Sequence, residues 1–160
     1  MRRAAIVAAM LVGGALLAAP AGHPARPWLI WNASASVPVG LYRAAPADQV
    51  AVADLVAVAT PAPLATYLAE RGYLPRDVPL IKRVAAFAGT EVCRCGAIVT
   101  VGGRVAAVAR PRDSRARPLP AWSGCRTLEA GEVFLLNPAP DSFDGRYFGP
   151  LADTAVIGRA

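Results

Sequence analysis

Two serine hydroxyls and a single lysine are the residues of this sequence whose types and spacing could carry chemistry. Ser34 and Ser36 stand two residues apart, just before Pro38, in a stretch of small residues. Such a stretch also fits a polar turn between a membrane anchor and a first strand, so the spacing alone does not identify a nucleophile. The sequence has 17 lysines and arginines together, and only Lys82 among them is a lysine.

Lys82 is the candidate base because a buried lysine can lose its proton, whereas an arginine in a protein cannot. The alternative is that an arginine-rich composition has left one lysine by chance. Lys82 lies in the apolar segment 79–87, whose desolvation lowers the pKa of an amine toward neutrality. The one histidine, His23, lies beside Pro24 with no carboxylate near it in sequence, so a Ser-His-Asp triad is not expected. These residues favour a Ser-Lys pair, in which a neutral amine activates a hydroxyl.

Composition and motifs exclude several other classes of protein. Hydrophobic residues make up 55% of the 160 residues and charged residues 18%, which suits one packed domain with a short appendage. The formal net charge is +6, but the arginines are scattered and not interleaved with aromatic residues, so nucleic acid is not expected as a partner. No HExxH, GxxxxGK[ST] or GxGxxG motif occurs, and we expect no metal or other cofactor.

The N-terminal segment has the layout of an export signal. Basic residues at positions 2 and 3 precede an uncharged apolar run over 4–19, and small residues at 18–22 would suit a cleavage site. The run is shorter than the roughly 20 residues that span a bilayer comfortably. A cleaved signal peptide and an uncleaved anchor both fit. We expect the anchor, over residues 1–22, with an exported domain over 23–160 and the aromatic patch 28–31 at the membrane interface.

The segments that must position these residues are mostly β-strands. Valine-rich and alternating patterns predict strands at 49–60 (one or two strands), 79–87, 91–95, 97–101, 104–109, 131–137 and 155–159. One short helix is expected over 61–71, from Leu64, Tyr67 and Leu68 at helical spacing and Gly72 beyond its end. Residues 110–124 and 138–149 are expected to be loops, the first of them exposed. The fold class predicted is mostly β, with one or two short helices after the N-terminal anchor helix.

The three cysteines fit an oxidising compartment, in which disulfides persist. Cys93 and Cys95 are too close in sequence for an unstrained bond, so we expect Cys125 to pair with one of them. Cys93 is the favoured partner and Cys95 the alternative. A zinc site is the rival interpretation, but three cysteines without a nearby histidine or a second cysteine pair make a poor ligand set.

Three ordered segments resemble the conserved boxes of type I signal peptidases. They are Ser34 to Ser36 followed by Pro38, residues 81–84 (IKRV) with Gly89 beyond, and residues 141–149 (DSFDGRYFG). The chain then ends in VIGRA, which is similar to the closing segment of that family. Residues 36–42 (SVPVGLY) more closely resemble the TraF-type branch, the conjugative transfer signal peptidases. The resemblance covers nearly all of residues 28–160 and implies a signal-peptidase-like β domain.

The resemblance implies a role for each matching residue. Ser36 would be the nucleophile and Lys82 its general base. The Ser34 hydroxyl and the Ser36 backbone N–H would form the oxyanion hole, and Ser142 would orient the Lys82 amine. Asp144 and Arg146 would form a supporting ion pair, with a place nearer the chemistry as an alternative for Asp144.

The resemblance also implies a location and partners. The catalytic domain would face the periplasm from the inner membrane, whose lipid would hold the single anchor, beside other components of conjugation or type IV secretion. The substrate would be an exported precursor, expected to be a pilin, cut after a small residue. Either water or the substrate's own N-terminus, giving a cyclic pilin, could resolve the acyl-enzyme.

The sequence departs from the housekeeping signal peptidases at two places. One residue, not two, separates Ser36 from Pro38, and the connector 96–128 is too short for a large accessory domain. Two other functions remain open. One is an anchored, non-catalytic β-domain scaffold of a conjugation or secretion apparatus, which would tolerate arginine at position 82. The other is a self-cleaving regulator of the Ser-Lys type, for which no scissile site or DNA-binding module is visible.

Overall fold

The computed structural model describes residues 2–18 and 29–160. Helix α1, Arg2–Ala18, is the N-terminal element and has 17 residues. In the described ranges, no helix combines the length and apolar character needed to cross a membrane. The predicted anchor therefore stays a prediction. Its proposed boundary after residue 22, together with His23 and Trp28, lies outside the described residues.

The domain after α1 is mostly β and contains three sheets. A five-stranded sheet has the order β10-β9-β4-β3-β11 and a four-stranded sheet has the order β7-β6-β5-β8. Strands β1 and β2 form a separate antiparallel pair. The strands of the five-stranded sheet are β3 (Leu55–Val58), β4 (Leu80–Phe87), β9 (Glu132–Leu135), β10 (Leu151–Ala152) and β11 (Val156–Arg159). The remaining strands are β1 (Leu29–Asn32), β2 (Gly40–Arg43), β5 (Glu91–Cys95), β6 (Ile98–Val101), β7 (Arg104–Val108) and β8 (Gly124–Thr127).

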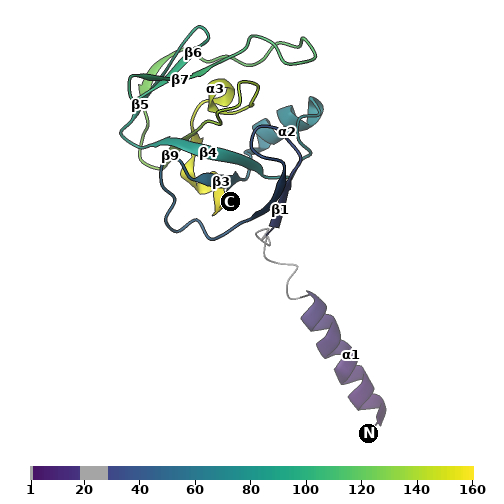
Figure 1. The fold of residues 1–160 in the computed structure, drawn as a ribbon. Helices are drawn as coiled ribbons and strands as arrows, with labels where there is room; N and C mark the ends of the chain where they lie inside the picture. Colours follow the sequence, from purple (N-terminus) through teal and green to yellow (C-terminus); the bar gives the residue numbers. More distant parts are fainter. Residues whose placement is uncertain (1, 19–28) are drawn as a thin grey trace.

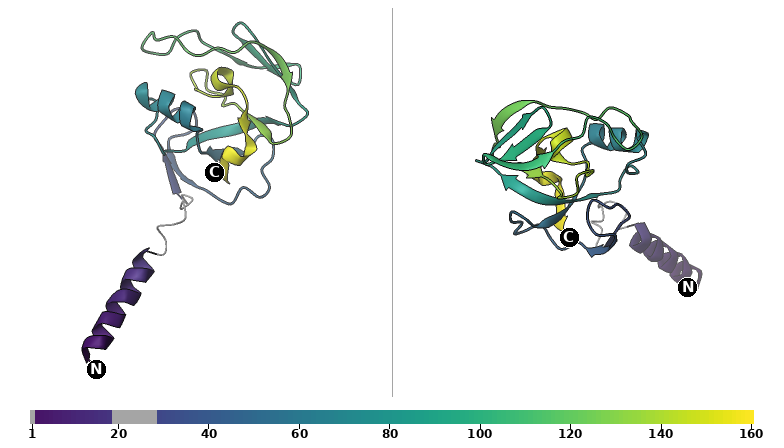
Figure 2. Two further views of the ribbon diagram at one scale, coloured as in Figure 1. Left: turned by 180° about the vertical axis from the view of Figure 1, so that it is seen from behind. Right: turned by 45° about the horizontal axis from the view of Figure 1, so that its top comes forward.

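Two short α-helices and one 3-10 turn, η2 (Asp153–Ala155), complete the domain, in agreement with the predicted one or two short helices. Helix α2 is Ala62–Glu70 and α3 is Gly145–Phe148. Figure 1 shows α3 between the four-stranded sheet and strand β4, and the view from behind in Figure 2 agrees. Only glycine fits at Gly145, because an added Cβ would lie 2.7 Å from the backbone oxygen of Leu135. This close approach seats α3 directly on β9.

Strand β4 is the central strand of the five-stranded sheet, and it carries Lys82. Its first half pairs with β3, where Lys82 lies opposite Val56, and its second half pairs with β9. Both neighbouring strands contribute fully buried valines, and the apolar cluster around them joins β3, β4 and β9. A second cluster, which includes Val92, Val99 and Phe134, joins the two larger sheets. Lys82 is therefore held in the buried centre of the five-stranded sheet.

Three of the predicted segments were wrong in detail. Residues 49–54 were expected to be strand but form a turn, in which the Asp54 carboxylate accepts a hydrogen bond from the backbone of Ala51 at 3.0 Å. The strand β8 begins at Gly124, inside the segment predicted as loop. The loop predicted at 138–149 contains α3, whose four residues are too few to show a helical period.

The described part of the aromatic patch at 28–31 is a strand of the domain. Ile30 of β1 is buried in a cluster with Val37, Ala57 and Ile81. Leu29 and Trp31 alternate with it and remain exposed, at 60% and 63%. An expectation based on hydrophobicity alone missed this alternation, which attaches β1 to the domain and leaves only one of its faces free.

Candidate active site

The serine loop is shaped by the side chain of Asn32, at the end of β1. Its amide nitrogen donates hydrogen bonds to the backbone oxygens of Ser34 at 2.8 Å, Val37 at 3.1 Å and Pro38 at 3.0 Å. Its amide oxygen accepts from the Ser34 backbone N–H at 3.2 Å and from the Ser34 hydroxyl at 2.8 Å. Because one buried amide contacts five polar groups of the loop, sharing its two N–H hydrogens among three backbone oxygens, the backbone around Ser36 is fixed before any substrate arrives.

The two serine hydroxyls lie within hydrogen-bonding distance of each other, with 3.0 Å between Ser34 Oγ and Ser36 Oγ. A hydroxyl carries one hydrogen. A Ser34 hydroxyl that donates to Asn32 can therefore only accept from Ser36 in this resting arrangement. To donate to a substrate oxygen, the Ser34 hydroxyl has to rotate away from Asn32.

Lys82 is buried, with 3% of its surface exposed. Its Nζ donates a hydrogen bond to Ser142 Oγ at 3.1 Å. Burial lowers the pKa of Lys82 from 10.5 to about 8; the negative charge of Asp144 opposes this shift, and the positive charge of Arg146 adds to it. An amine with this pKa has an appreciable neutral fraction near physiological pH, which is the form that can accept a proton.

Asp144 and Arg146 form a buried ion pair behind the lysine. Their side chains are 0% and 2% exposed, and two guanidinium nitrogens of Arg146 reach the two carboxylate oxygens of Asp144 at 2.8 and 3.0 Å. Asp144 also caps α3 by accepting from the Arg146 backbone at 3.2 Å. Arg146 donates to the Asn137 backbone oxygen at 2.6 Å. Because the pair is bidentate and hydrogen-bonded on both sides, it fixes the loop that carries Ser142.

Asn137 connects this loop to the strand of Lys82. Its side-chain oxygen accepts from the Arg83 backbone N–H at 2.9 Å, and its nitrogen donates to the Ile81 backbone oxygen at 3.2 Å. The backbone N–H of Asn137 donates to the Asp144 carboxylate at 3.0 Å. The Asn137 side chain, called the Asn137 clamp below, therefore holds β4 at the two residues that flank Lys82.

Sequence reasoning assigned no role to Asn32 or Asn137. The available signal was rarity, because these are the only two asparagines in the chain. Both are buried at this site, with 9% and 2% of their surface exposed. The Asn-x-Ser order at 32–34 is also typical of a side chain that hydrogen-bonds to the backbone two residues on.

One cavity of about 330 Å³ brings four of the predicted residues together: Ser34, Ser36, Lys82 and Ser142 line it. Asp144 and Arg146 do not line it. Ser36 and Lys82 share the cavity without a direct hydrogen bond between their side chains among the described residues; the partner of the Ser36 hydroxyl is Ser34, and that of the Lys82 amine is Ser142. Such contacts commonly tighten only when a substrate is bound.

The segment expected to be an exposed loop supplies another wall of this cavity. Arg110, Arg112, Asp113, Ser114 and Leu119 line it, and they face the cavity together with Leu68 of α2 and Tyr73. The structure shows that residues 110–120, called the strap below, are bound to the α2 end of the domain. The Arg71 side chain donates to the Pro118 oxygen at 2.8 Å, and Arg117 donates to the Arg71 oxygen at 3.1 Å.

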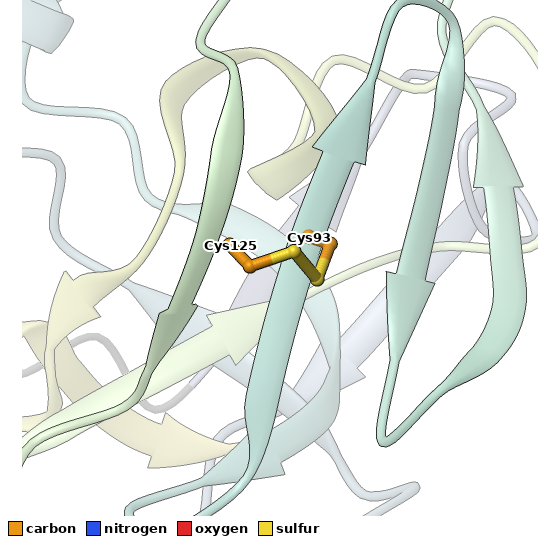
Figure 3. The surroundings of a disulfide bond; sticks show 2 residues. All are labelled: Cys93 and Cys125. Carbon is orange, nitrogen blue, oxygen red and sulfur yellow. A yellow bond between two sulfur atoms is a disulfide. The ribbon is translucent and has the colours of Figure 1, made fainter.

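The cysteines lie in the four-stranded sheet, away from the cavity lining. Cys93 of β5 and Cys125 of β8 stand directly opposite each other and form a disulfide, with their Cα atoms 4.0 Å apart (Figure 3). Cys95 is free and exposed. The carboxylate of Glu91 lies beside the disulfide, but the two bonded sulfurs are not free thiolates and so cannot act as a zinc ligand set.

Comparison with known proteins identifies the family. The family model described as signal peptidase, peptidase S26, matches residues 2–160. A protein of Sinorhizobium fredii named "Probable conjugal transfer protein TraF" is 37% identical over 139 residues, which cover 81% of this chain and 73% of that protein. A "Plasmid transfer protein TraF" of Escherichia coli is 37% identical over 156 residues, covering 91% of this chain and 86% of that protein.

Among solved structures, a signal peptidase I of Enterococcus faecalis V583 aligns over 71% of this chain and 97% of its own, at 17% identity and a TM-score of 0.42. The family model and the TraF relatives together span the serine loop, the lysine strand and the Asp144 loop. The chain belongs to the signal peptidase family, peptidase S26, and within it to the TraF-type branch.

Proposed function

We propose that this chain is a membrane-anchored serine endopeptidase that removes signal or leader sequences from exported precursors, with Ser36 as nucleophile and Lys82 as general base. The observation that carries the proposal is the environment of Lys82. A buried amine with a pKa of about 8 lies in the same cavity as Ser36 and is oriented by Ser142. A buried amine needs a polar partner in any role, but a purely structural lysine would have no reason to share a cavity with a serine hydroxyl and to lack a carboxylate partner among the described residues.

The first half of the reaction forms an acyl-enzyme. Neutral Lys82 removes the proton from Ser36 Oγ as that oxygen attacks the scissile carbonyl carbon. The Ser36 N–H and the Ser34 hydroxyl, once it has rotated away from Asn32, donate hydrogen bonds to the oxyanion. The Lys82 ammonium then returns its proton to the leaving amine as the peptide bond breaks, and Ser36 is left esterified.

The second half releases the product and restores the enzyme. Lys82, neutral again, removes a proton from water or from an amine, which attacks the ester carbon. The Ser36 oxygen leaves and takes the proton back from Lys82. Water gives a free carboxylate, whereas the substrate's own N-terminal amine gives a cyclic peptide.

We further propose that the substrate is a conjugative pilin precursor, and that residues 1–22 anchor the enzyme in the inner membrane with residues 23–160 in the periplasm. The names of the TraF relatives, which refer to conjugal and plasmid transfer, support a substrate of the conjugation apparatus. Exposed apolar side chains support a membrane location. They include Met10 and Leu11 of α1, and Trp31 of β1 opposite Leu41 of β2. Lipid and other conjugation components are the expected partners.

The test is cleavage of a co-expressed pilin precursor by the wild type, Ser36→Ala and Lys82→Arg, at matched yields in the membrane fraction. We expect each substitution to reduce processing by about 10³-fold or more, because the members of such a catalytic pair act as a unit. Arg104→Gln, on the exposed edge strand β7, is the matched control and should process normally.

Retained activity in Lys82→Arg would show that the amine is not the base. If instead the wild type and all variants left every exported precursor uncut, that result would favour the alternative of a non-catalytic scaffold. Folded protein in each case is verified by circular dichroism, so that loss of processing is not loss of the domain.

A further inference from the structure

Two arginines of the strap, Arg110 and Arg112, line the same cavity as Ser36 and Lys82. Both side chains are exposed. In the part of the chain that the structure describes, neither guanidinium forms an ion pair with a carboxylate. The cavity therefore has two unneutralised positive charges beside the proposed catalytic pair.

Asp113, the residue directly after Arg112, is engaged elsewhere. Its carboxylate accepts hydrogen bonds from the Tyr73 hydroxyl, from Arg117 Nε at 2.7 Å, and from the backbone N–H groups of Arg115 and Arg117 at 2.9 Å each. These four donors saturate its oxygens. Asp113 thus ties the strap to Tyr73 and leaves Arg110 and Arg112 without an internal counterion.

The backbone of both arginines is held in place. The Arg110 N–H donates to the Tyr147 hydroxyl at 2.9 Å, and Tyr147 stacks on Phe143, the neighbour of Ser142. The Arg112 guanidinium donates one hydrogen bond to the Ala116 backbone oxygen at 2.7 Å and keeps its other N–H groups, and the Arg112 backbone forms a bridge with Pro118. The other carboxylate at the cavity, Asp141, is exposed and makes no ion pair with either arginine. Guanidinium groups are planar donors that pair well with a carboxylate, and these two are carried at the cavity on a backbone that is held in place.

We propose that Arg110 and Arg112 form a carboxylate-binding subsite that selects substrates carrying an acidic group close to the scissile bond. This inference rests on the peptidase function proposed above. The acidic group is either an aspartate or glutamate side chain or the α-carboxylate of a short C-terminal leaving peptide. Both present the same planar anion, and the experiment separates them.

The test uses quenched-fluorescence peptides with alanine before the scissile bond. Members of a set differ only by glutamate, glutamine or lysine at one flanking position, and each is made with a free and with an amidated C-terminus. We expect the wild type to cleave glutamate peptides about tenfold faster in kcat/KM than glutamine peptides, a typical effect of a charge-assisted contact. If the leaving-peptide carboxylate is the ligand, the free acid is preferred over the amide by a similar factor.

Variants assign the preference to the subsite. Arg110→Gln/Arg112→Gln should lose the preference and keep the rate on glutamine peptides. Arg115→Gln, an exposed position on the same strap that does not line the cavity, should retain it. Arg110→Glu/Arg112→Glu should reverse it toward lysine peptides, a gain that a misfolded strap cannot produce. Binding of the same peptides to Ser36→Ala, by fluorescence anisotropy, measures selection without cleavage.

The outcomes separate this inference from the proposed function. Cleavage of all peptides at equal rates by the wild type overturns the subsite and leaves the peptidase standing. Selective binding to Ser36→Ala without cleavage by the wild type supports the subsite and overturns the peptidase. If there is neither cleavage nor a preference in binding, the subsite is overturned as well.

Discussion

At the scale of single residues, the proposed chemistry depends on the burial and the hydrogen-bond partner of one amine, that of Lys82. Lys82 Nζ is taken out of water and given a neutral partner, Ser142, in place of a carboxylate. The nearest full charges, Asp144 and Arg146, neutralise each other in a bidentate pair. Burial is therefore the largest influence on the pKa of Lys82, which falls to about 8. A direct Lys-Asp pair would instead have kept the amine protonated.

The pH dependence of cleavage follows from this pKa. In the proposed mechanism the neutral amine is the base, so kcat/KM should rise with pH, with a midpoint of about 8, and level off above it. On the acid side it should fall about tenfold for each pH unit. Initial rates on a fixed peptide substrate, with circular dichroism at each pH, provide the measurement. A rate that is flat through pH 8, or that falls as pH rises, would contradict the role given to Lys82.

At the scale of elements, the site depends on contacts between segments far apart in the chain. The serine loop follows β1, the lysine lies in β4, and the supporting ion pair lies at the start of α3. Asn137 joins the last two, because its side chain bonds to the backbone of Ile81 and Arg83 while its backbone bonds to Asp144 and Arg146. A single amide thus sets the distance between the lysine strand and the Ser142 loop.

Asn137→Ala should destabilise the domain by about 1–3 kcal/mol, because the Arg83 N–H and the Ile81 oxygen lose buried partners. Urea unfolding followed by circular dichroism measures this loss. We also expect kcat to fall more than KM changes, because Lys82 and Ser142 lose their fixed spacing. An exposed substitution such as Arg104→Ala should remain within about 0.5 kcal/mol of the wild type. Equal stability of Asn137→Ala and the wild type would show that the Asn137 clamp is dispensable.

Particular residues show how far the sequence could predict this arrangement. Local pattern was sufficient for β4, because the apolar run 79–87 is bounded by turn residues, and rarity was sufficient to single out Lys82. Asn137 was missed because its partners lie 54 and 56 residues away, and no local pattern encodes that contact. The strap was correctly predicted to be an exposed loop from its many arginines and prolines, but nothing local in its sequence indicated that it lines the cavity. Tyr73 and Arg71, which hold it over the cavity, lie some 40 residues away.

At the scale of the whole molecule, the two larger sheets enclose α3 from opposite sides (Figures 1 and 2). Gly145 seats the helix against β9, and Arg94 of β5 approaches it from the four-stranded sheet. The Arg94 side chain is 5% exposed, lies over the Tyr147 ring, and donates hydrogen bonds to the backbone oxygens of Arg146 and Pro120. The four-stranded sheet therefore helps to hold the loop that orients Lys82.

The disulfide that closes this sheet should contribute to the stability of the domain. It joins residues 32 positions apart, and a cross-link of that span typically contributes about 2–4 kcal/mol. Cys93→Ser should lower the melting temperature, and the melting temperature of the wild type should fall in the presence of a reductant. Cys95→Ser, at the free thiol, is the matched control and should melt as the wild type does. Reductant-insensitive melting of the wild type would contradict this contribution.

The presence of a single lysine in the chain, Lys82, has a spectroscopic consequence. Because the sequence contains no other lysine, protein grown on lysine enriched in ¹³C at the ε position would carry one labelled side chain. Its methylene resonance would report on the protonation of a single amine, without assignment by mutagenesis. Substrate-derived inhibitors, the strap variants and Asn137→Ala could then be compared by how far each displaces the same titration curve. The scarcity that marks this residue in the sequence also makes it directly observable in solution.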